Sequence, residues 1–464
     1  MKTSILAFLI LFSAFSCQSP HSEEVSLFES LEKLPSVAVT DLADFSLGNE
    51  HILISGTQQQ ITLESIQLLS GYHAAIKIGE ETNCLENATS ITKYPFAAKL
   101  FYPLENQGLE VSQLQIISKD KLGISLLYSI RNVDTSAKSV KFQFQANTDL
   151  QPSVLKDSTF GVNAADQIIF DKLTGIFTAK DEANDWYAVW GSSQGFVVSP
   201  NNSDCTPEIS ELGASAGLEI SVELAGNEER VIPIFIAGSD QGEFTAIETL
   251  IDLRADVQPD WDQNFALIDS LQSTSKITIP DQEIQEAYEW SKYKTGLMEF
   301  AKGLKRNSGG DDDSEELYKV IELVSKDFVK KVDQAIFSTK GPRHLSPGHV
   351  MIQPLLLIYP FGILPDIENR VTYIRPNLPV YWEHASIENL WIDDNQISIY
   401  INSADNQMTV EVTQTQKKAG ISIELPEKYT KVKVLGKEVS NDTKDGFRRI
   451  LMTGNHAKIE ASKD

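Results

Sequence analysis

Cysteine is scarce in this sequence, and the spacing of the few cysteines excludes the common zinc motifs. Three occur in 464 residues, Cys17, Cys84 and Cys205, and none is paired with another in the C-x2-C spacing of zinc sites. Cys84 and Cys205 could form a disulfide in an oxidising compartment. The sequence does not show whether their Cα atoms come within reach of each other, so this pairing stays open. We expect no metal and no cofactor.

Positive charge is also in short supply. The chain has 40 Lys and Arg against 65 Asp and Glu, which gives a formal net charge of −25. A surface of this charge repels phosphate backbones, so we expect no nucleic-acid partner. Neutral oligosaccharides or polysaccharides suit this charge better than polyanions do.

No hydrophobic run has the length of a membrane-spanning helix. The N-terminal run, residues 5–15, has eleven largely apolar residues, whereas a span needs about 20. It follows Met1-Lys2 and leads to Ala14-Phe15-Ser16-Cys17, which resembles the lipobox that precedes a lipid-modified cysteine. We therefore predict a signal peptide at residues 1–16 and a lipid anchor on Cys17 with a tether to residue 35. The protein would be an exported outer-membrane lipoprotein on the periplasmic or cell-surface side; an ordinary secretory signal is the alternative.

What the sequence does contain is mostly β-strand patterning, in two regions. Within residues 36–240, Val140-Lys-Phe142-Gln-Phe144 alternates strictly between apolar and polar residues, as a strand with one buried face does. Within residues 367–464, Ile397-Ser-Ile399-Tyr-Ile401 alternates in the same way. Short strands separated by turn residues favour antiparallel sandwiches. We predict a large N-terminal sandwich and a smaller C-terminal one.

Between the sandwiches, residues 241–366 are predicted to be helical. Apolar residues recur at helical spacing in 242–275, in 281–304 after Pro280-Asp281, and in 314–337. The run from Met351 to Leu364 is nearly all apolar but contains Pro354, Pro360 and Gly362, which predicts a buried, kinked helix. The fold class is therefore mainly β with an α segment.

Several short motifs appear in a definite order along this plan. Asn184-Asp-Trp186-Tyr-Ala-Val-Trp190 lies late in the first sandwich, and Ile279-Pro-Asp281 with Trp290-Ser-Lys292 begins the helical segment. The remaining motifs close the helical segment, and they are Gly362-Ile-Leu-Pro365-Asp366, Arg375-Pro-Asn-Leu378-Pro-Val-Tyr-Trp382 and Ile387-Glu-Asn389-Leu. Together they resemble the six-hairpin glycosidases, specifically the debranching-enzyme and amylo-α-1,6-glucosidase-like group, over residues 36–304 and 345–435.

The resemblance implies an (α/α)6 barrel between the sandwiches, and the chain is too short for one. Twelve helices of about 11–12 residues with loops of about 2–8 residues need roughly 180 residues. Asp281 to Asp366 is a span of 86 residues. We expect a truncated barrel of three helices: the first, one inner helix and the last.

Catalytic residues cannot be assigned by the resemblance. Glycoside hydrolysis needs two carboxylates on opposite sides of the scissile bond, and the glycine-arginine-aspartate motif of the family's sites is absent from the sequence. Asp311-Asp312-Asp313 is predicted to be a solvated loop and helix cap. His344 and His349 do not share a helix face. Gly191-Ser-Ser193-Gln-Gly195 matches the G-x-S-x-G pattern, but a strand rather than a helix is predicted after it, so we interpret it as a hairpin turn.

Tryptophans are the candidate glycan contacts, because their flat faces can stack on sugar rings. For each of them, packing in the core is the alternative. Glu383 could contribute to a sugar site, and Asp281 and Lys292 match family positions but could be structural. The candidates are Trp186, Trp190, Trp290, Trp382 and Glu383.

Three hypotheses remain. The leading one is a carbohydrate-associated envelope lipoprotein, related to debranching-type glycosidases, that binds a glycan or is degenerate rather than catalytic. The second is an active α-glycan hydrolase with a reduced helical domain. The third is a structural or adhesive envelope protein, whose three helices would expose apolar faces that a full barrel covers.

Overall fold

The described residues of the computed structural model form two compact units, which meet in the sequence between Trp261 and Asp262. Cys17, the predicted 314–337 helix, Asp311 to Asp313, His344 and His349 lie outside the described residues. No described helix is long and apolar enough to cross a membrane. The described residues are 27–305 and 352–463, with gaps at 41, 50, 64, 154–160, 200–204, 206–208, 367–368, 405, 418, 440–442, 445 and 453.

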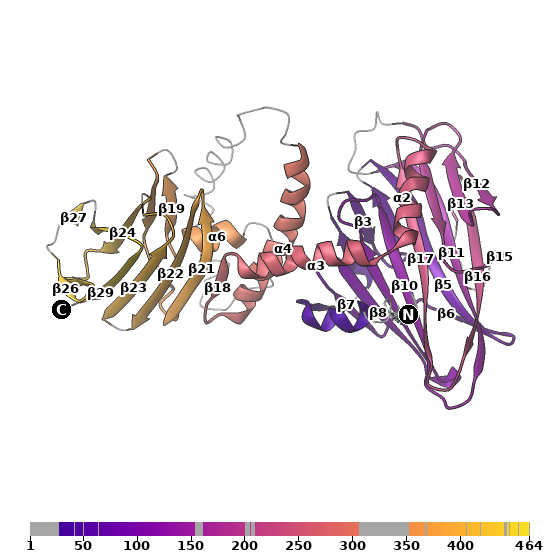
Figure 1. The fold of residues 1–464 in the computed structure, drawn as a ribbon, viewed down its shortest axis with the longest axis horizontal. Helices are drawn as coiled ribbons and strands as arrows, with labels where there is room; N and C mark the ends of the chain where they lie inside the picture. Colours follow the sequence, from indigo (N-terminus) through magenta and orange to yellow (C-terminus); the bar gives the residue numbers. More distant parts are fainter. Residues whose placement is uncertain are drawn as a thin grey trace, which may run out of the picture. The chain divides into compact units, whose positions relative to one another are not determined.

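The first unit is a β-sandwich of two large sheets. Its described strands form a nine-stranded sheet, ordered β1-β7-β8-β9-β10-β17-β14-β13-β12, and an eight-stranded sheet, ordered β15-β16-β11-β5-β4-β3-β2 with β6 paired to β5 (Figure 1). The strands are β1 (Val37–Val39), β2 (Ser46–Gly48), β3 (Ile52–Ser55), β4 (Gln60–Leu63), β5 (Ile66–Ile78), β6 (Glu81–Cys84), β7 (Ser90–Lys93), β8 (Ala97–Leu104), β9 (Leu109–Ile117), β10 (Gly123–Asn132), β11 (Lys138–Pro152), β12 (Asp166–Asp171), β13 (Ile176–Asp181), β14 (Tyr187–Gly191), β15 (Val197–Ser199), β16 (Ser215–Leu224) and β17 (Glu229–Ser239).

The alternating residues of β11 explain how the sheets meet. Val140, Phe142 and Phe144 are buried in the core between the two sheets, while Lys141 is exposed and pairs with Glu219 on β16. Because successive strand residues point to opposite faces, this pattern buries one face and leaves the other to solvent or to a covering loop. The predicted alternation of this strand is confirmed.

Two helices follow the first sandwich directly, as the apolar spacing of residues 242–275 predicts. They are α2 (Glu243–Ala255) and α3 (Gln258–Ser273). Helix α2 packs on β17, β14 and β10, with Ala246, Leu250 and Leu253 buried. It therefore belongs to the first unit, and the helical segment predicted for 241–366 is shared between the units.

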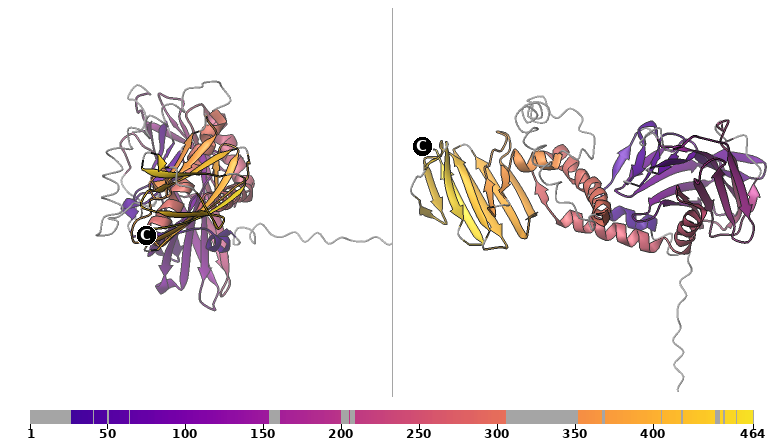
Figure 2. Two further views of the ribbon diagram at one scale, coloured as in Figure 1. Left: turned by 90° about the vertical axis from the view of Figure 1, so that its left-hand side faces the viewer. Right: turned by 90° about the horizontal axis from the view of Figure 1, so that it is seen from above.

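The second unit is a smaller sandwich, and its helices lie in the N-terminal part of its sequence. In the described residues it has a seven-stranded sheet, β18-β21-β22-β23-β29-β25-β26, and a five-stranded sheet, β19-β20-β24-β28-β27. Its strands from β19 onward are coloured orange to yellow in Figure 2. Its elements are β18 (Lys276–Thr278), α4 (Gln282–Lys305), α6 (Ile352–Ile358), β19 (Ile363–Asp366), β20 (Val371–Ile374), β21 (His384–Ile392), β22 (Asn395–Ala404), β23 (Gln407–Gln414), β24 (Gly420–Pro426), β25 (Lys431–Val434), β26 (Lys437–Glu438), β27 (Thr443–Lys444), β28 (Phe447–Met452) and β29 (His456–Ser462).

The helix predicted for 281–304 is present as α4, but the helix predicted from Met351 to Leu364 is half wrong. Helix α6 ends at Ile358, and β19 begins at Ile363. Gly362 has a φ of 62°, and a Cβ there would lie 1.9 Å from the carbonyl oxygen of Arg375. Pro360 and this left-handed glycine end the helix and turn the chain into a strand.

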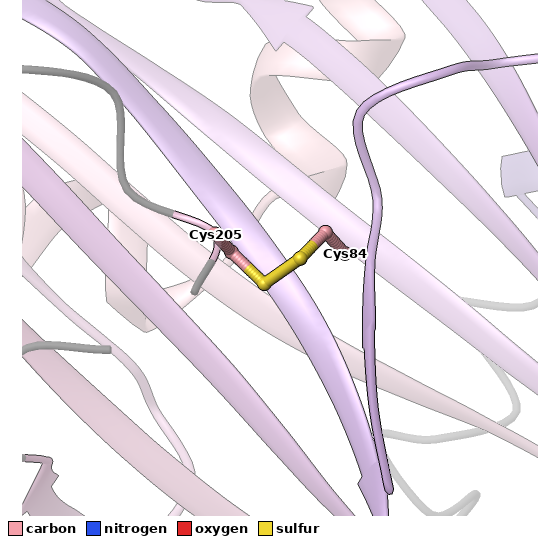
Figure 3. The surroundings of a disulfide bond; sticks show 2 residues. All are labelled: Cys84 and Cys205. Atoms are coloured by element: carbon pink, nitrogen blue, oxygen red, sulfur yellow. A yellow bond between two sulfur atoms is a disulfide. The ribbon is translucent and has the colours of Figure 1, made fainter. Parts of the chain in front are cut away.

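A disulfide joins Cys84 and Cys205, which settles the pairing that the sequence leaves open. Their Cα atoms are 5.5 Å apart across a separation of 121 residues (Figure 3). Cys84 ends β6 and lies opposite Ala75 of β5. The bond therefore fixes the chain around Cys205 to the eight-stranded sheet, and it fits an oxidising compartment.

Loss of this disulfide should destabilise the first unit. A cross-link over a loop of this length restricts the unfolded chain strongly, so we expect Cys84→Ser with Cys205→Ser to lower the free energy of unfolding by about 2–5 kcal/mol. Denaturant unfolding followed by tryptophan fluorescence measures the change. Adding a reductant to the native chain should reproduce it, and a double variant as stable as the native chain would contradict the prediction.

Candidate functional site

Three of the four candidate tryptophans are core residues. The side chains of Trp186, Trp190 and Trp382 are 3%, 0% and 1% exposed, and Trp190 stacks on Phe177 with ring centroids 5.3 Å apart. An indole ring enclosed in this way has no face free for a sugar, which corrects their assignment as glycan contacts and favours the packing alternative. Trp290 on α4 is half-buried and meets Tyr293 edge to face at 5.9 Å.

The polar family positions also have structural partners. Asp281 accepts a hydrogen bond from the backbone N–H of Ile284 at 3.1 Å, so it caps α4. Lys292 is buried and pairs with Glu289 at 3.0 Å. Glu424 is fully buried beside Arg375 and Arg449, which bind its two carboxylate oxygens. These groups stabilise the fold, and none of them lies in an open site.

Ser193 does not have the surroundings of a nucleophile. β14 ends at Gly191 and β15 begins at Val197, so strands stand on both sides of the G-x-S-x-G pattern. The predicted second strand is therefore confirmed. The connection is not a hairpin, however, because β14 and β15 belong to different sheets.

The outward face of the seven-stranded sheet gathers exposed aromatic and polar side chains. Ile397, Ile399 and Ile401 of β22 point into the core, so Gln396, Ser398 and Tyr400 point outward. Tyr400 lies opposite Ser386 of β21 and Glu411 of β23, and Trp391 lies opposite Gln396. Trp391 and Tyr400 are 54% and 38% exposed. We call this surface the aromatic face; its residues are Ser386, Glu388, Trp391, Gln396, Ser398, Tyr400, Glu411, Thr413 and His456.

A β-bulge puts Trp391 on this face. The register shifts between Ile387 and Leu390, and Asn389 has a φ of 57°. By strict alternation Trp391 would share the inward side of Ile387, but the one extra residue reverses the order, so Leu390 points inward and Trp391 outward. Asparagine tolerates this left-handed conformation better than most residues do.

Carboxylates flank the tyrosine on the aromatic face. Partial burial raises the pKa of Tyr400, and the nearby charges of Glu388 and Glu411 raise it further. Glu411 also contacts His456, with 2.9 Å between Oε1 and Nε2. Trp391 lies opposite Gln396, and Gln396 is four residues from Tyr400 on β22. The two aromatic residues therefore lie about 13 Å apart along the strand direction. The face thus offers two aromatic platforms with hydrogen-bonding groups between and beside them.

The sequence contained a pattern for one of these aromatic residues. The alternation of residues 397–401 places Tyr400 outward, yet we used that pattern only to predict a strand. Trp391 could not be placed without knowing the bulge. Glu383 is exposed just before β21, where its carbonyl oxygen accepts the N–H of Ser403 at 2.8 Å. It lies near one edge of the aromatic face, next to the outward His384.

Two ionisable groups in the first unit, the buried His73 and the half-buried Asp166, have opposite pKa shifts. His73 lies on β5 opposite Gln145, its ring nitrogens have no hydrogen-bond partner among the described residues, and burial lowers its pKa to about 4. Burial raises the pKa of Asp166 to about 6, against hydrogen bonds from Thr148 and the backbone N–H of Leu150. Among the described residues, no three His, Cys, Asp or Glu side chains gather as a metal site requires.

These shifts predict opposite pH effects on stability. The pKa of His73 is lowered from 6.5 to about 4, so the stability that its neutral form contributes to the fold is complete above pH 6.5 and is lost as the pH falls to 4. The pKa of Asp166 is raised from 3.8 to about 6, so the stability that its neutral form contributes is complete below pH 3.8 and is lost as the pH rises to 6. Relative to the native chain, His73→Gln should gain stability on acidification by up to about 3 kcal/mol. Asp166→Asn should gain stability on alkalinisation by less than this, because Asp166 is partly exposed and solvent screens its interactions.

Urea unfolding at several values between pH 4 and 7 checks both signs. The double variant serves as the control, because its stability should follow the pH much as the native chain does. Curves for the two single variants that stay parallel to the native curve would contradict the assigned shifts.

Comparison with known proteins gives similarity to solved structures only. No family model and no curated protein matches the chain. A protein described as a kojibiose phosphorylase from the human microbiome is 10% identical with a TM-score of 0.41, over 55% of this chain and 39% of that one. A bacterial glucoamylase complexed with acarbose is 7% identical with a TM-score of 0.33, over 56% and 43%. This chain thus spans about two fifths of the length of either enzyme.

Proposed function

We propose that this chain is an exported lipoprotein that binds a neutral oligosaccharide or polysaccharide on the aromatic face and does not hydrolyse it. The observation that carries the proposal is the exposure of Trp391 and Tyr400 on one side of the same sheet. Indole and phenol rings offer the flat apolar surface on which the C–H side of a pyranose ring packs.

The polar members of the face complement the hydroxyl groups of a sugar. Ser386 and Ser398 can donate and accept hydrogen bonds, and the carboxylates of Glu388 and Glu411 accept two or more each. The separation of about 13 Å between the two aromatic rows is longer than one sugar ring. The ligand that uses both platforms is therefore an oligosaccharide or a longer chain.

The same arrangement argues against hydrolysis at this face. Glu388 and Glu411 both lie beside Tyr400 on one open surface, whereas the acid and base of a glycosidase stand on opposite sides of the bond. A catalytic acid also needs a shaped, partly buried pocket to stay protonated. The shortage of residues for a barrel between Asp281 and Asp366 supports the same conclusion.

Export and lipid anchoring on Cys17 complete the proposal. They rest on the N-terminal pattern of the sequence and are consistent with the Cys84–Cys205 disulfide, since disulfides persist in oxidising compartments. The relation to debranching-type glycosidases rests on the ordered motifs of the sequence. On this interpretation, the chain retains the N-terminal and C-terminal sandwiches of those enzymes and has lost their catalytic activity.

Loss of either aromatic ring should weaken glycan binding. We expect Trp391→Ala and Tyr400→Ala each to raise the Kd for an α-glucan oligosaccharide about 3- to 10-fold, as lost aromatic stacking predicts. Calorimetric titration of the chain from Ser19 onward, which keeps every described residue, measures this change. Phe244→Ala is the matched control, because Phe244 is 77% exposed on α2 and lies in the first unit.

The same samples are assayed for released reducing sugar. Hydrolysis would establish a reduced but active glycosidase instead of a binding protein. If the chain binds neither α-glucan nor host-type oligosaccharides, this result would favour a structural or adhesive role. Equal affinities of the native chain and both aromatic variants would place the glycan somewhere other than the aromatic face.

A further inference from the structure

The nine-stranded sheet of the first unit ends at an unblocked edge strand, β12. Among the described strands only β13 pairs with β12, so the other side of β12 is an edge of the sheet (Figure 1). An edge strand presents a row of N–H and C=O groups with which another strand can pair, and natural sheets block such edges with lysine, proline or a β-bulge. The six residues of β12 include no lysine or proline, and their register with β13 has no bulge.

Ile168 and Phe170 direct their backbone groups to this edge. The N–H of Asp166 donates to the carbonyl oxygen of Leu212 at 2.8 Å rather than to β13. Because the direction of the backbone groups alternates along an antiparallel strand, those of Ile168 and Phe170 point the same way as those of Asp166. Within the described part of the chain, no hydrogen bond reaches the backbone groups of Ile168 and Phe170 from that side.

Three apolar side chains are exposed along the same edge. Ile169 is 69% exposed in the middle of β12, and Leu173, in the turn that follows, is 97% exposed. Leu212 is 40% exposed beside Asp166, at the other end of the strand. Exposed apolar residues that are scattered singly need no explanation, but these three accompany a row of unpaired backbone groups. A strand that pairs with β12 therefore gains apolar contacts as well as hydrogen bonds.

We propose that two copies of this chain associate through β12, paired antiparallel with Ile169 of each copy opposite the partner's Ile169. In this register, Ile168 of one copy exchanges two N–H···O bonds with the partner's Phe170. The two-fold axis repeats the exchange between Phe170 and the partner's Ile168. The backbone groups of both residues are then satisfied, and the two nine-stranded sheets become continuous.

The other registers fit less well. A pairing that places Ile168 opposite the partner's Ile169 sets backbone groups that point outward against groups that point to β13, so the ladder cannot form. Centring the pairing on Ile168 puts the partner's Phe170 opposite Asp166, where the chain at Leu212 already lies. Centring it on Phe170 puts Ile168 opposite the partner's turn after β12, and only one pair of bonds remains.

The outward side chains also complement each other in the proposed register. Gln167, Ile169 and Asp171 are the exposed residues of β12, and they share one side of the sheet. The two Ile169 side chains meet on the axis, and the Gln167 amide lies opposite the carboxylate of the partner's Asp171, a donor opposite an acceptor. Leu173 and Leu212 lie at opposite ends of β12, so antiparallel pairing brings Leu173 of each copy toward the partner's Leu212.

The test is sedimentation equilibrium of the chain from Ser19 onward over a series of protein concentrations. Physiological ionic strength is used, because its Debye length of about 8 Å screens the repulsion between two such acidic chains. We expect a reversible equilibrium between monomer and dimer. Ile169→Lys should raise the Kd of the dimer by about tenfold or more, because it removes the apolar contact and sets two ammonium groups opposite each other on the axis.

Leu451→Lys is the matched control. Leu451 is 67% exposed on β28 of the second unit, which lies between β24 and β27 in its sheet. A lysine there changes the charge by the same amount without touching β12, so the Kd of the dimer should equal that of the native chain. Trp391→Ala and Tyr400→Ala should also leave the Kd unchanged, because the aromatic face takes no part in the pairing.

Single cysteines test the register, and they also serve if Ile169→Lys does not fold. Residues directly opposite each other in a non-hydrogen-bonded pair have Cα atoms about 4.5 Å apart, within the reach of a disulfide. Ile169→Cys should therefore cross-link two chains under mild oxidation, which a non-reducing gel detects. Cys84 and Cys205 are already paired, which leaves the introduced cysteine as the reactive thiol. Gln167→Cys is the matched control, since it is exposed on the same side but lies opposite the partner's Asp171 rather than opposite itself.

A native chain that stays monomeric at every concentration would overturn the proposal, and so would a dimer that Ile169→Lys leaves intact. Failure of Ile169→Cys to cross-link would overturn it too. Cross-linking of Gln167→Cys as fast as that of Ile169→Cys would have the same consequence, because the strands would then pair in another register or not at all.

Discussion

Each described strand has two faces, and in strands such as β22 the hydrophobic core takes one of them. In β22 the side chains of Ile397, Ile399 and Ile401 are buried, so those of Ser398 and Tyr400 point outward. The rest of the structure depends on this alternation. It fixes the register of both sandwiches, and it decides which side chains remain free to meet a ligand.

The same constraint explains which parts of the fold could be predicted. The mainly β class, the strand at Val140–Phe144 and the helix after Asp281 follow from the spacing of apolar residues, and all are present. The end of α6 could not be predicted, because it depends on the close approach of Gly362 to the backbone of Arg375, and the sequence does not show that these two residues meet. The Cys84–Cys205 pair was likewise beyond the sequence, since it depends on which strands become neighbours.

The candidate site was harder to predict than the fold, and the tryptophans show why. A tryptophan suits a sugar-binding surface and a large core equally well, and residue type alone does not separate the two. Trp190 fills the space between sheets beside Phe177, whereas Trp391 lies outward only because one extra residue at Asn389 reverses the alternation. A single bulge thus decides whether an indole ring stabilises the core or is available to bind.

Binding without hydrolysis is consistent with how the polar groups are distributed. Two buried charged groups, Lys292 with Glu289 and Glu424 with its two arginines, are neutralised by partners within the fold. Glu388 and Glu411 are partly exposed and lie on the same face of one sheet, beside Tyr400, so they do not flank a bond from opposite sides. The aromatic face therefore offers the hydrogen-bonding groups that can hold a sugar, and its two carboxylates are not arranged as the opposed pair that cleaves one.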